Sequence, residues 1–217
     1  MNIEQARFNM IEQQIRPWDV LDLDVLALLG EMRREEFVPA AWRSLAFADM
    51  EIPLGHGESM MAPKMEARIM QEMTIRPDDT VLEIGTGSGY LTALLAARAK
   101  QVHSIDVIGE FSAQAHARLL AHRLDNVKLV TADASRGWSQ AAPYSVIVLT
   151  GSTPVLPDAF KRDLTIGGRL FAILGDSPAM TAVRITRVSE SAWTTDHLFE
   201  TDIKPLVNAL QPERFVF

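Results

Sequence analysis

The sequence of 217 residues carries 28 acidic and 21 basic residues, and its net charge of -7 argues against broad electrostatic binding to nucleic acid or to an anionic membrane. Its 47% hydrophobic and 23% charged residues are typical of a globular protein, and its length suits a single domain over 1–217. Cysteine is absent, which excludes disulfides and thiolate metal sites, so we expect no metal. With no signal-peptide pattern at the start, we expect a cytoplasmic protein.

The first third of the sequence predicts helices and no strands. The expected helices cover 2–16, 22–34, a short segment from Pro39 to Arg43, and 63–74. In the first of these, Phe8, Ile11 and Ile15 share one face, and Arg7 falls on the solvent side. Residues 50–62 contain glycine and proline without a periodic pattern, which predicts an irregular loop. We therefore predict a helical cap with an attached loop over 1–75.

Strand and helix patterns alternate through the rest of the chain, 76–217. The expected strands cover 80–84, 101–106, 127–131, 144–149 and 169–174, and the expected helices cover 89–99, 109–124 and about 156–164. Strict alternation with near-continuous apolar strands predicts a doubly wound, mostly parallel α/β sheet of Rossmann-like type. Residues 179–188 and 192–199 alternate polar and apolar side chains instead, which predicts an antiparallel hairpin at the sheet edge.

One stretch, Thr80-Val-Leu-Glu-Ile-Gly-Thr-Gly-Ser-Gly-Tyr90, carries the chemistry. A buried strand that turns sharply into a helix needs glycine where φ is positive or where a ligand touches the backbone. The NAD and FAD fingerprint spaces its glycines as G-x-G-x-x-G, so the third glycine here, Gly89, comes one residue early. A phosphate-binding P-loop needs Lys-Ser/Thr after its last glycine, where this chain has Tyr90. The remaining reading, E-x-G-x-G-x-G, resembles the first motif of S-adenosylmethionine-dependent methyltransferases of Rossmann-like fold.

Acidic residues end the first three expected strands, at Glu83, Asp106 and Asp133. In a doubly wound sheet the ligand lies across the carboxyl ends of the strands, so these side chains converge on one site. Glu83 suits a cationic methionine end, Asp106 the ribose hydroxyls and Asp133 the adenine edge. The expected cofactor-binding residues are Glu83, Gly85, Thr86, Gly87, Ser88, Gly89, Asp106, Val107, Asp133 and Ala134. The expected cofactor is S-adenosylmethionine, with S-adenosylhomocysteine as its product.

Further motifs extend this resemblance to one family. They are Glu12-Gln-Gln-Ile15, Phe37-Val-Pro39, Pro53-Leu-Gly-His-Gly57, the glycine stretch, Arg136-Gly-Trp138 and Gly167-Gly-Arg-Leu170, in that order. From about residue 10 to about 188 the chain resembles the protein-L-isoaspartate O-methyltransferases, which esterify the abnormal carboxylate of isoaspartyl residues. The resemblance implies a carboxylate acceptor in a peptide or protein.

The expected acceptor loop departs from the family pattern Gly-Gln-Thr-Ile-Ser-Gln/Ala-Pro. Over residues 57–63 this chain reads Gly-Glu-Ser-Met-Met-Ala-Pro. Ser59 takes the threonine position, and Met61 replaces the serine that lies next to the substrate carboxylate in the family. A thioether has almost no hydrogen-bonding capacity, and Glu58 adds a negative charge. Lys64 follows the proline and offers a compensating charge.

Three functions remain open from the sequence alone. The first is isoaspartyl methyltransferase activity despite the changed loop. The second is methyl transfer on the same scaffold to a small lipophilic acceptor, which Met61 favours, and the third is a non-catalytic cofactor-binding subunit. The candidate catalytic residues are Ser59, His56 and Met61. A carboxylate needs no general base, because it is ionised at neutral pH, whereas a phenol or amine acceptor would give His56 that role.

Overall fold

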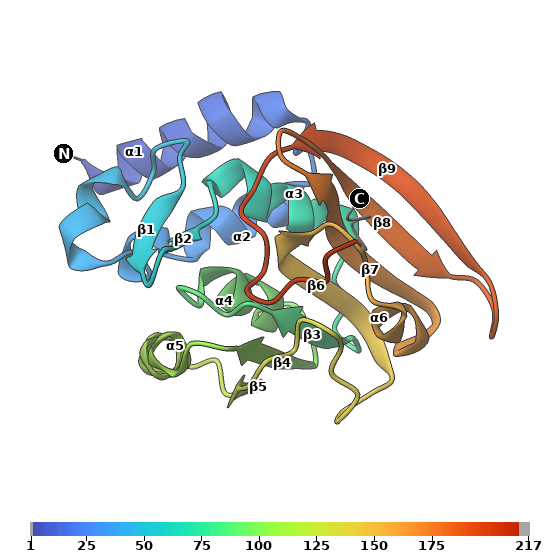
Figure 1. Cartoon of the computed structure of the whole chain (residues 1–217). Helices are drawn as coiled ribbons and strands as arrows, with labels where there is room; N and C mark the ends of the chain where they lie inside the picture. The colour runs from blue at the N-terminus through green and yellow to red at the C-terminus, as the bar shows by residue number, and fades with distance from the viewer. Residues whose placement is uncertain (1, 213–217) are drawn as a thin grey trace, which may run out of the picture.

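A seven-stranded sheet forms the centre of the computed structural model, which describes residues 2–212 (Figure 1). Its strand order is β5-β4-β3-β6-β7-β8-β9, in which β5 to β7 are parallel and β8 and β9 are antiparallel. The strands are β3 (Thr80–Ile84), β4 (Gln101–Asp106), β5 (Val127–Thr131), β6 (Tyr144–Thr153), β7 (Leu164–Asp176), β8 (Ala179–Arg187) and β9 (Trp193–Thr201). The predicted α/β fold and its antiparallel C-terminal strands are confirmed.

Helices cover both faces of the sheet. They are α1 (Ile3–Met10), α2 (Leu23–Glu31), α3 (Pro63–Met73), α4 (Tyr90–Ala96), α5 (Gly109–Ala121) and α6 (Asp158–Arg162). Neighbouring residues of a strand point to opposite faces, so Val81 joins the core cluster that contains α2 to α5, and Leu82 joins the cluster that contains Phe160 of α6. Because both faces of the sheet are buried, apolar side chains occupy consecutive positions in these strands, which explains their continuous hydrophobic sequences.

The strand order reverses at the middle of the sheet. Strands β3, β4 and β5 follow one another toward one edge, and the chain then crosses back so that β6 pairs with β3 on its other side. A reversal of this kind leaves a crevice at the carboxyl ends of the two central strands, where ligands bind in doubly wound sheets. The turn after β3 therefore opens onto the expected ligand site.

The first helix corrects the predicted helical face. Phe8 is 58% exposed, whereas Arg7 is buried and forms an ion pair of 2.6 Å with Glu35. The α-helical hydrogen bonding ends at Met10, and residues 11–15 continue as a wider π-helical turn. A π turn has more residues per turn than an α-helix, so residues before and after it do not follow one 3.6-residue period. The spacing of Phe8, Ile11 and Ile15 therefore predicted the wrong buried face for residues 3–10.

Residues 50–62 correct the predicted irregular loop. They contain a small antiparallel hairpin of β1 (Ile52–Gly55) and β2 (Glu58–Met60). His56 and Gly57 form its turn with φ of 54° and 76°. Strands of four and three residues are too short to produce an alternating pattern, and the proline and glycines obscured what remained.

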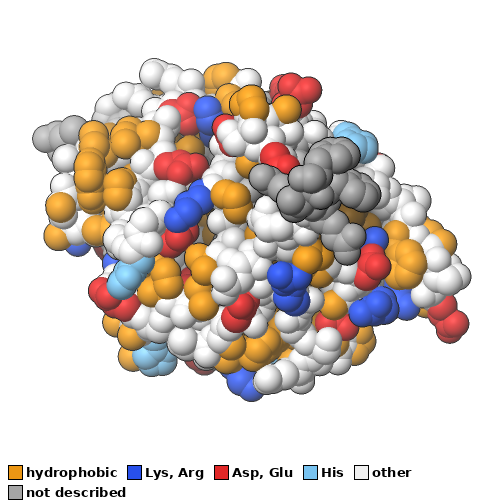
Figure 2. Space-filling model, in the orientation of Figure 1, with side chains coloured by type: hydrophobic (Ala, Val, Ile, Leu, Met, Phe, Trp, Pro, Cys, Tyr) orange, Lys and Arg blue, Asp and Glu red, His pale blue; other side chains and the backbone are white. Residues whose placement is uncertain are grey.

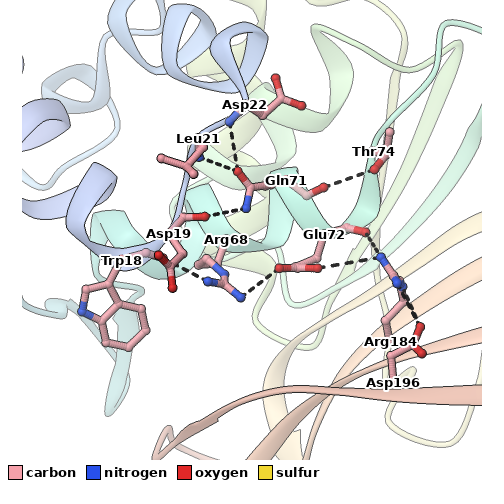
Figure 3. A network of polar contacts seen from close by, with 10 residues as sticks. All are labelled: Trp18, Asp19, Leu21, Asp22, Arg68, Gln71, Glu72, Thr74, Arg184 and Asp196. Carbon is pink, nitrogen blue, oxygen red and sulfur yellow. Dashed lines mark hydrogen bonds and ion pairs between the residues drawn. The ribbon is translucent and has the colours of Figure 1, made fainter.

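Helix α3 joins the N-terminal region to the sheet (Figure 3). The side chain of Gln71 accepts a hydrogen bond of 2.7 Å from the Leu21 amide and donates one of 2.7 Å to the Asp19 carbonyl. One residue further on, Glu72 contacts Arg184 of β8. The predicted division into a cap over 1–75 and a core over 76–217 stays a prediction, and residues 1 and 213–217 of those ranges lie outside the described part.

The described residues include no helix that is long and apolar enough to cross a membrane. On the face of the molecule that Figure 2 shows, acidic and basic side chains are interspersed.

Candidate active site

The turn between β3 and α4 has the backbone that its glycines predict. Gly85, Gly87 and Gly89 have φ of 99°, 51° and 82°, in the left-handed region that other residues rarely adopt. Space is also restricted: a Cβ on Gly85 would lie 2.1 Å from Oγ1 of Thr150, and one on Gly89 would lie 2.8 Å from Cβ of Ala115 in α5. The turn therefore needs glycine for both conformation and packing.

Glu83 is a fully buried carboxylate with one unsatisfied oxygen. Its Oε2 accepts hydrogen bonds from Thr92 (2.5 Å) and Ser104 (2.6 Å), and Oε1 has no partner among the described residues. Burial raises the pKa of Glu83 to about 8, against the lowering effect of these two hydrogen bonds. A buried carboxylate oxygen that borders a cavity without a donor is the environment expected for contact with a cationic ligand group.

Asp106 and Asp133 follow β4 and β5 at the same edge. Asp106 is buried and accepts backbone hydrogen bonds from Gly87 (2.9 Å) and Ile108 (2.8 Å), so it fixes the shape of the glycine turn. Asp133 accepts a hydrogen bond of 2.9 Å from the Ser135 amide, and this bond is the main reason that its pKa is lowered. Both side chains border the same cavity as Glu83.

This cavity brings together most of the residues that the sequence predicted. The predicted residues that line it are Ser59, Met61, Glu83, Gly85, Thr86, Gly87, Ser88, Asp106, Val107, Asp133 and Ala134. Gly89 does not line it and caps the N-terminus of α4 instead. The specific roles predicted for these residues stay predictions.

His56 lies outside the cavity. Its ring is about half exposed and pairs with Glu110 at 2.8 Å, with Phe111 packed edge-on at 5.6 Å between ring centroids. Ser59, two residues beyond the turn, does line the cavity, and its hydroxyl donates a hydrogen bond to Glu51. The structure therefore separates the three catalytic candidates, with Ser59 and Met61 at the cavity and His56 away from it.

A buried arginine holds the acceptor loop in place. Arg34 is 1% exposed and donates hydrogen bonds to the carbonyls of Met61 (2.6 Å) and Ala46 (2.9 Å). It also pairs with the buried carboxylate of Glu66, which borders the cavity. Burial raises the pKa of Glu66 to about 8, although Arg34 opposes this shift. The guanidinium lies 5.1 Å from the ring centroid of Tyr90, so it also contacts the first residue of α4.

A C-terminal segment that the sequence analysis missed covers the cavity. Residues 203–207 line it, and they lie beside β6 through hydrogen bonds between the backbones of Ser152 and Leu206 (2.9 Å) and of Ser152 and Lys204 (3.1 Å). Figure 1 shows this red segment running back from β9 toward α4 and β6. Asn208 donates a hydrogen bond of 2.8 Å to Asp133. The sequence of residues 203–207 has no periodic pattern, and only Pro205 indicated an extended segment.

The doubly wound sheet, the glycine turn and the acidic residues at three strand ends define a Rossmann-like methyltransferase fold. The family described as Protein-L-isoaspartate(D-aspartate) O-methyltransferase (PCMT) matches residues 5–211. The chain belongs to this family, and it is an S-adenosylmethionine-dependent O-methyltransferase. The predicted family, fold, enzyme class and cofactor are thereby confirmed.

Individual relatives agree with the family match. Protein-L-isoaspartate O-methyltransferase 1 of Rhodopseudomonas palustris strain HaA2 is 39% identical over 202 residues, which are 93% of this chain and 82% of that protein. A protein-L-isoaspartate O-methyltransferase of R. palustris strain CGA009 is 36% identical and covers 94% of this chain and 95% of its own. A crystal structure of a putative protein-L-isoaspartate O-methyltransferase from Plasmodium falciparum has a TM-score of 0.81 at 17% identity, covering 95% of this chain and 99% of that one.

Proposed function

We propose that this chain esterifies the free carboxylate of isoaspartyl residues in peptides and proteins, and that its altered acceptor loop does not abolish this activity. The observation that carries the proposal is that Glu83, Asp106 and Asp133 line one cavity together with the loop residues Ser59 and Met61. The family match over residues 5–211 favours this acceptor over a small lipophilic one. The binding of S-adenosylhomocysteine by the P. falciparum protein supports the same use of the site.

The residues at the glycine turn fit S-adenosylmethionine. The free Oε1 of Glu83 suits the cationic methionine end of the cofactor, because a neighbouring cation would compensate the free-energy cost of a buried, ionised Glu83. Asp106 retains lone pairs for ribose hydroxyls beyond its two backbone bonds, and Asp133 lies at the adenine end. When bound, the cofactor supplies an electrophilic methyl group. The protein's task is to orient the acceptor toward it and to exclude water.

The acceptor side of the cavity suits an ionised nucleophile. A carboxylate is deprotonated at neutral pH and needs no base, which agrees with the position of His56 outside the cavity. Arg34 fixes the backbone at Met61, so the loop is held rigidly although the side chain there is a thioether. The Ser59 hydroxyl can donate to the acceptor if it exchanges its present partner, Glu51.

A second cavity supports a peptide as the acceptor. It shares Glu51, Met61 and Ile203 with the first and extends past Trp18 and Lys64. Lys64 lies 4.3 Å from the centre of the Trp18 ring and pairs with Asp49 at 2.8 Å, which keeps this wall ordered. A peptide that places its isoaspartyl carboxylate in the first cavity would thus have room to continue into the second.

The proposal is tested by initial-rate transfer of labelled methyl from S-adenosylmethionine to an isoaspartyl peptide, with the aspartyl peptide of the same sequence as control. We expect base-labile label on the isoaspartyl peptide alone. Binding of S-adenosylhomocysteine without transfer to either peptide would contradict the proposal and favour a non-catalytic role. The cytoplasmic location expected from the sequence stays a prediction.

A further inference from the structure

Most of the charged residues that line the cavity at the glycine turn are acidic, although the proposed acceptor is an anion. Six acidic residues line it: Glu51, Glu58, Glu66, Glu83, Asp106 and Asp133. Among the described residues that line it, the only lysine, arginine or histidine is Lys204. The pKa values of Glu66 and Glu83 are raised to about 8, so these two groups are largely protonated at neutral pH. The carboxylates of Glu51 and Glu58 beside the acceptor loop still repel an incoming carboxylate unless a cation compensates them.

Lys204 is held at the acceptor end of the cavity. Its ammonium donates a hydrogen bond of 2.7 Å to the carbonyl of Gly57 and also binds the carboxylate of Glu58. Gly57 lies in the turn of the β1–β2 hairpin and Glu58 begins β2, so both partners belong to the start of the acceptor loop. The backbone of Lys204 is fixed to β6 by its carbonyl, which accepts a hydrogen bond of 3.1 Å from the Ser152 amide. The position of the charge is therefore set from both sides.

Lys204 retains the capacity to bind one more acceptor atom. An ammonium group has three N–H donors, and the contacts to Gly57 and Glu58 use two of them. Its side chain is 48% exposed, so an incoming peptide can reach it. The adjacent loop position holds Met61, whose thioether cannot supply a comparable hydrogen bond.

We propose that Lys204 positions the acceptor carboxylate for methyl transfer and that Glu58 competes with this carboxylate for the lysine ammonium. This inference rests on the proposed function and identifies the residue that selects an anionic acceptor. In the transfer, a carboxylate oxygen forms the bond to the methyl carbon while the methyl–sulfur bond breaks and its electron pair stays on sulfur. The ester is neutral, so Lys204 loses its charge-assisted hydrogen bond to the acceptor and Glu58 is again the only carboxylate on the ammonium, which favours product release.

The proposal predicts that changes at Lys204 and at Glu58 shift the KM for the isoaspartyl peptide in opposite directions. A purely structural ion pair would predict the same direction for both. Lys204→Met is expected to raise the KM for an isoaspartyl peptide about ten-fold or more, the value of one charge-assisted hydrogen bond. Glu58→Gln is expected to lower that KM several-fold, because it removes the competing carboxylate. Lys204→Arg is expected to keep the KM within a few-fold of the parent. Lys161→Met, a surface change at a lysine paired with Asp158, is the matched control and is expected to leave KM unchanged.

The measurements are the KM and kcat of each variant, together with S-adenosylhomocysteine affinity by calorimetry to establish an intact cofactor site. An unchanged KM in Lys204→Met would overturn the proposal. A loss of activity in both Lys204→Met and Glu58→Gln would also overturn it, because it would identify the pair as a structural link. If Lys204→Met does not fold, Glu58→Gln still tests the proposal: a lower KM supports it, and an unchanged or higher KM contradicts it. A parent protein that binds the cofactor product but methylates no isoaspartyl peptide would overturn the proposed function itself.

Discussion

Replacing Arg34 by methionine is the sharpest test of how the acceptor loop is held. The change keeps an unbranched apolar stem but removes the guanidinium that bonds to Glu66 and to the carbonyls of Met61 and Ala46. Arg34 and Glu66 are 1% and 2% exposed, so no water replaces the lost donors at the carboxylate. The variant therefore leaves a buried acid and two carbonyls without their partner.

At pH 9, above the pKa of Glu66, the expected loss of unfolding free energy is about 3–5 kcal/mol, the cost of removing one partner from a buried ion pair. That is a large part of the 5–15 kcal/mol typical of a folded domain. The loss should depend on pH. Arg34 lowers the pKa of Glu66, so removing it raises that pKa further above about 8. A raised carboxyl pKa contributes stability at low pH that is lost as pH rises through the folded value, so the variant should be weakest relative to the parent near pH 9.

Urea denaturation at pH 6 and pH 9 measures both effects. The matched control is Arg33→Met, since Arg33 is the neighbouring arginine but is exposed and pairs with Glu36 at the surface. We expect the control to change stability by less than about 1 kcal/mol. The double variant Arg34→Met/Glu66→Gln should be more stable than Arg34→Met at pH 9. A loss below about 1 kcal/mol for Arg34→Met, or no recovery in the double variant, would refute this account of the buried pair.

Three further predictions concern the cavity. Glu83→Gln should flatten the fall in stability of the cofactor-free protein between about pH 5 and 8, by up to about 1.4 kcal/mol per pH unit. The reason is that the folded protein keeps Glu83 protonated up to about pH 8, whereas the unfolded chain ionises it above about pH 4.3. Urea titrations at several pH values measure this. Gly89→Ala should cost about 2–4 kcal/mol in the same assay, because its Cβ would lie 2.8 Å from that of Ala115 at a φ of 82°. Met61→Ser should raise kcat/KM for an isoaspartyl peptide several-fold, the value of about one hydrogen bond, as measured by initial rates.

Each of these has a control or a contradicting outcome. Gly167→Ala has a similar φ of 81° with no atom within 4 Å of the added Cβ, so it should cost only about 1 kcal/mol. Equal losses at Gly89 and Gly167 would show that packing against α5 is unimportant. An unchanged pH profile in Glu83→Gln would contradict the raised pKa, and no gain in Met61→Ser would show that the loop tolerates the thioether.

The central strands could be predicted closely from the sequence because their signal is local. The structure has β3, β4 and β5 at the predicted residues, since buried parallel strands are short apolar runs that end in turn residues. The same locality explains why Glu83, Asp106 and Asp133 line one cavity, because residues that end parallel strands meet at one edge whatever the loops do.

The features that were missed depend on tertiary contacts. Arg34 and Glu66 lie 32 positions apart and look like ordinary surface charges, so only the fold shows that they form a buried pair. Lys204 reaches the site through backbone bonds to Ser152, which no side-chain pattern records. His56 was predicted to lie in the site because its neighbours in the sequence belong to the acceptor loop, yet the hairpin turn directs its ring toward Glu110. The acceptor half was therefore harder to predict than the cofactor half.

The most direct test of the central claim locates the methyl group on the product. The protein is incubated with S-adenosylmethionine and an equal mixture of an isoaspartyl peptide and its aspartyl counterpart, and fragment mass spectrometry identifies the modified residue. The account predicts a base-labile methyl ester on the isoaspartyl residue and none on the aspartyl peptide. Methylation of both peptides, or of neither while S-adenosylhomocysteine binds tightly in the same preparation, would contradict it.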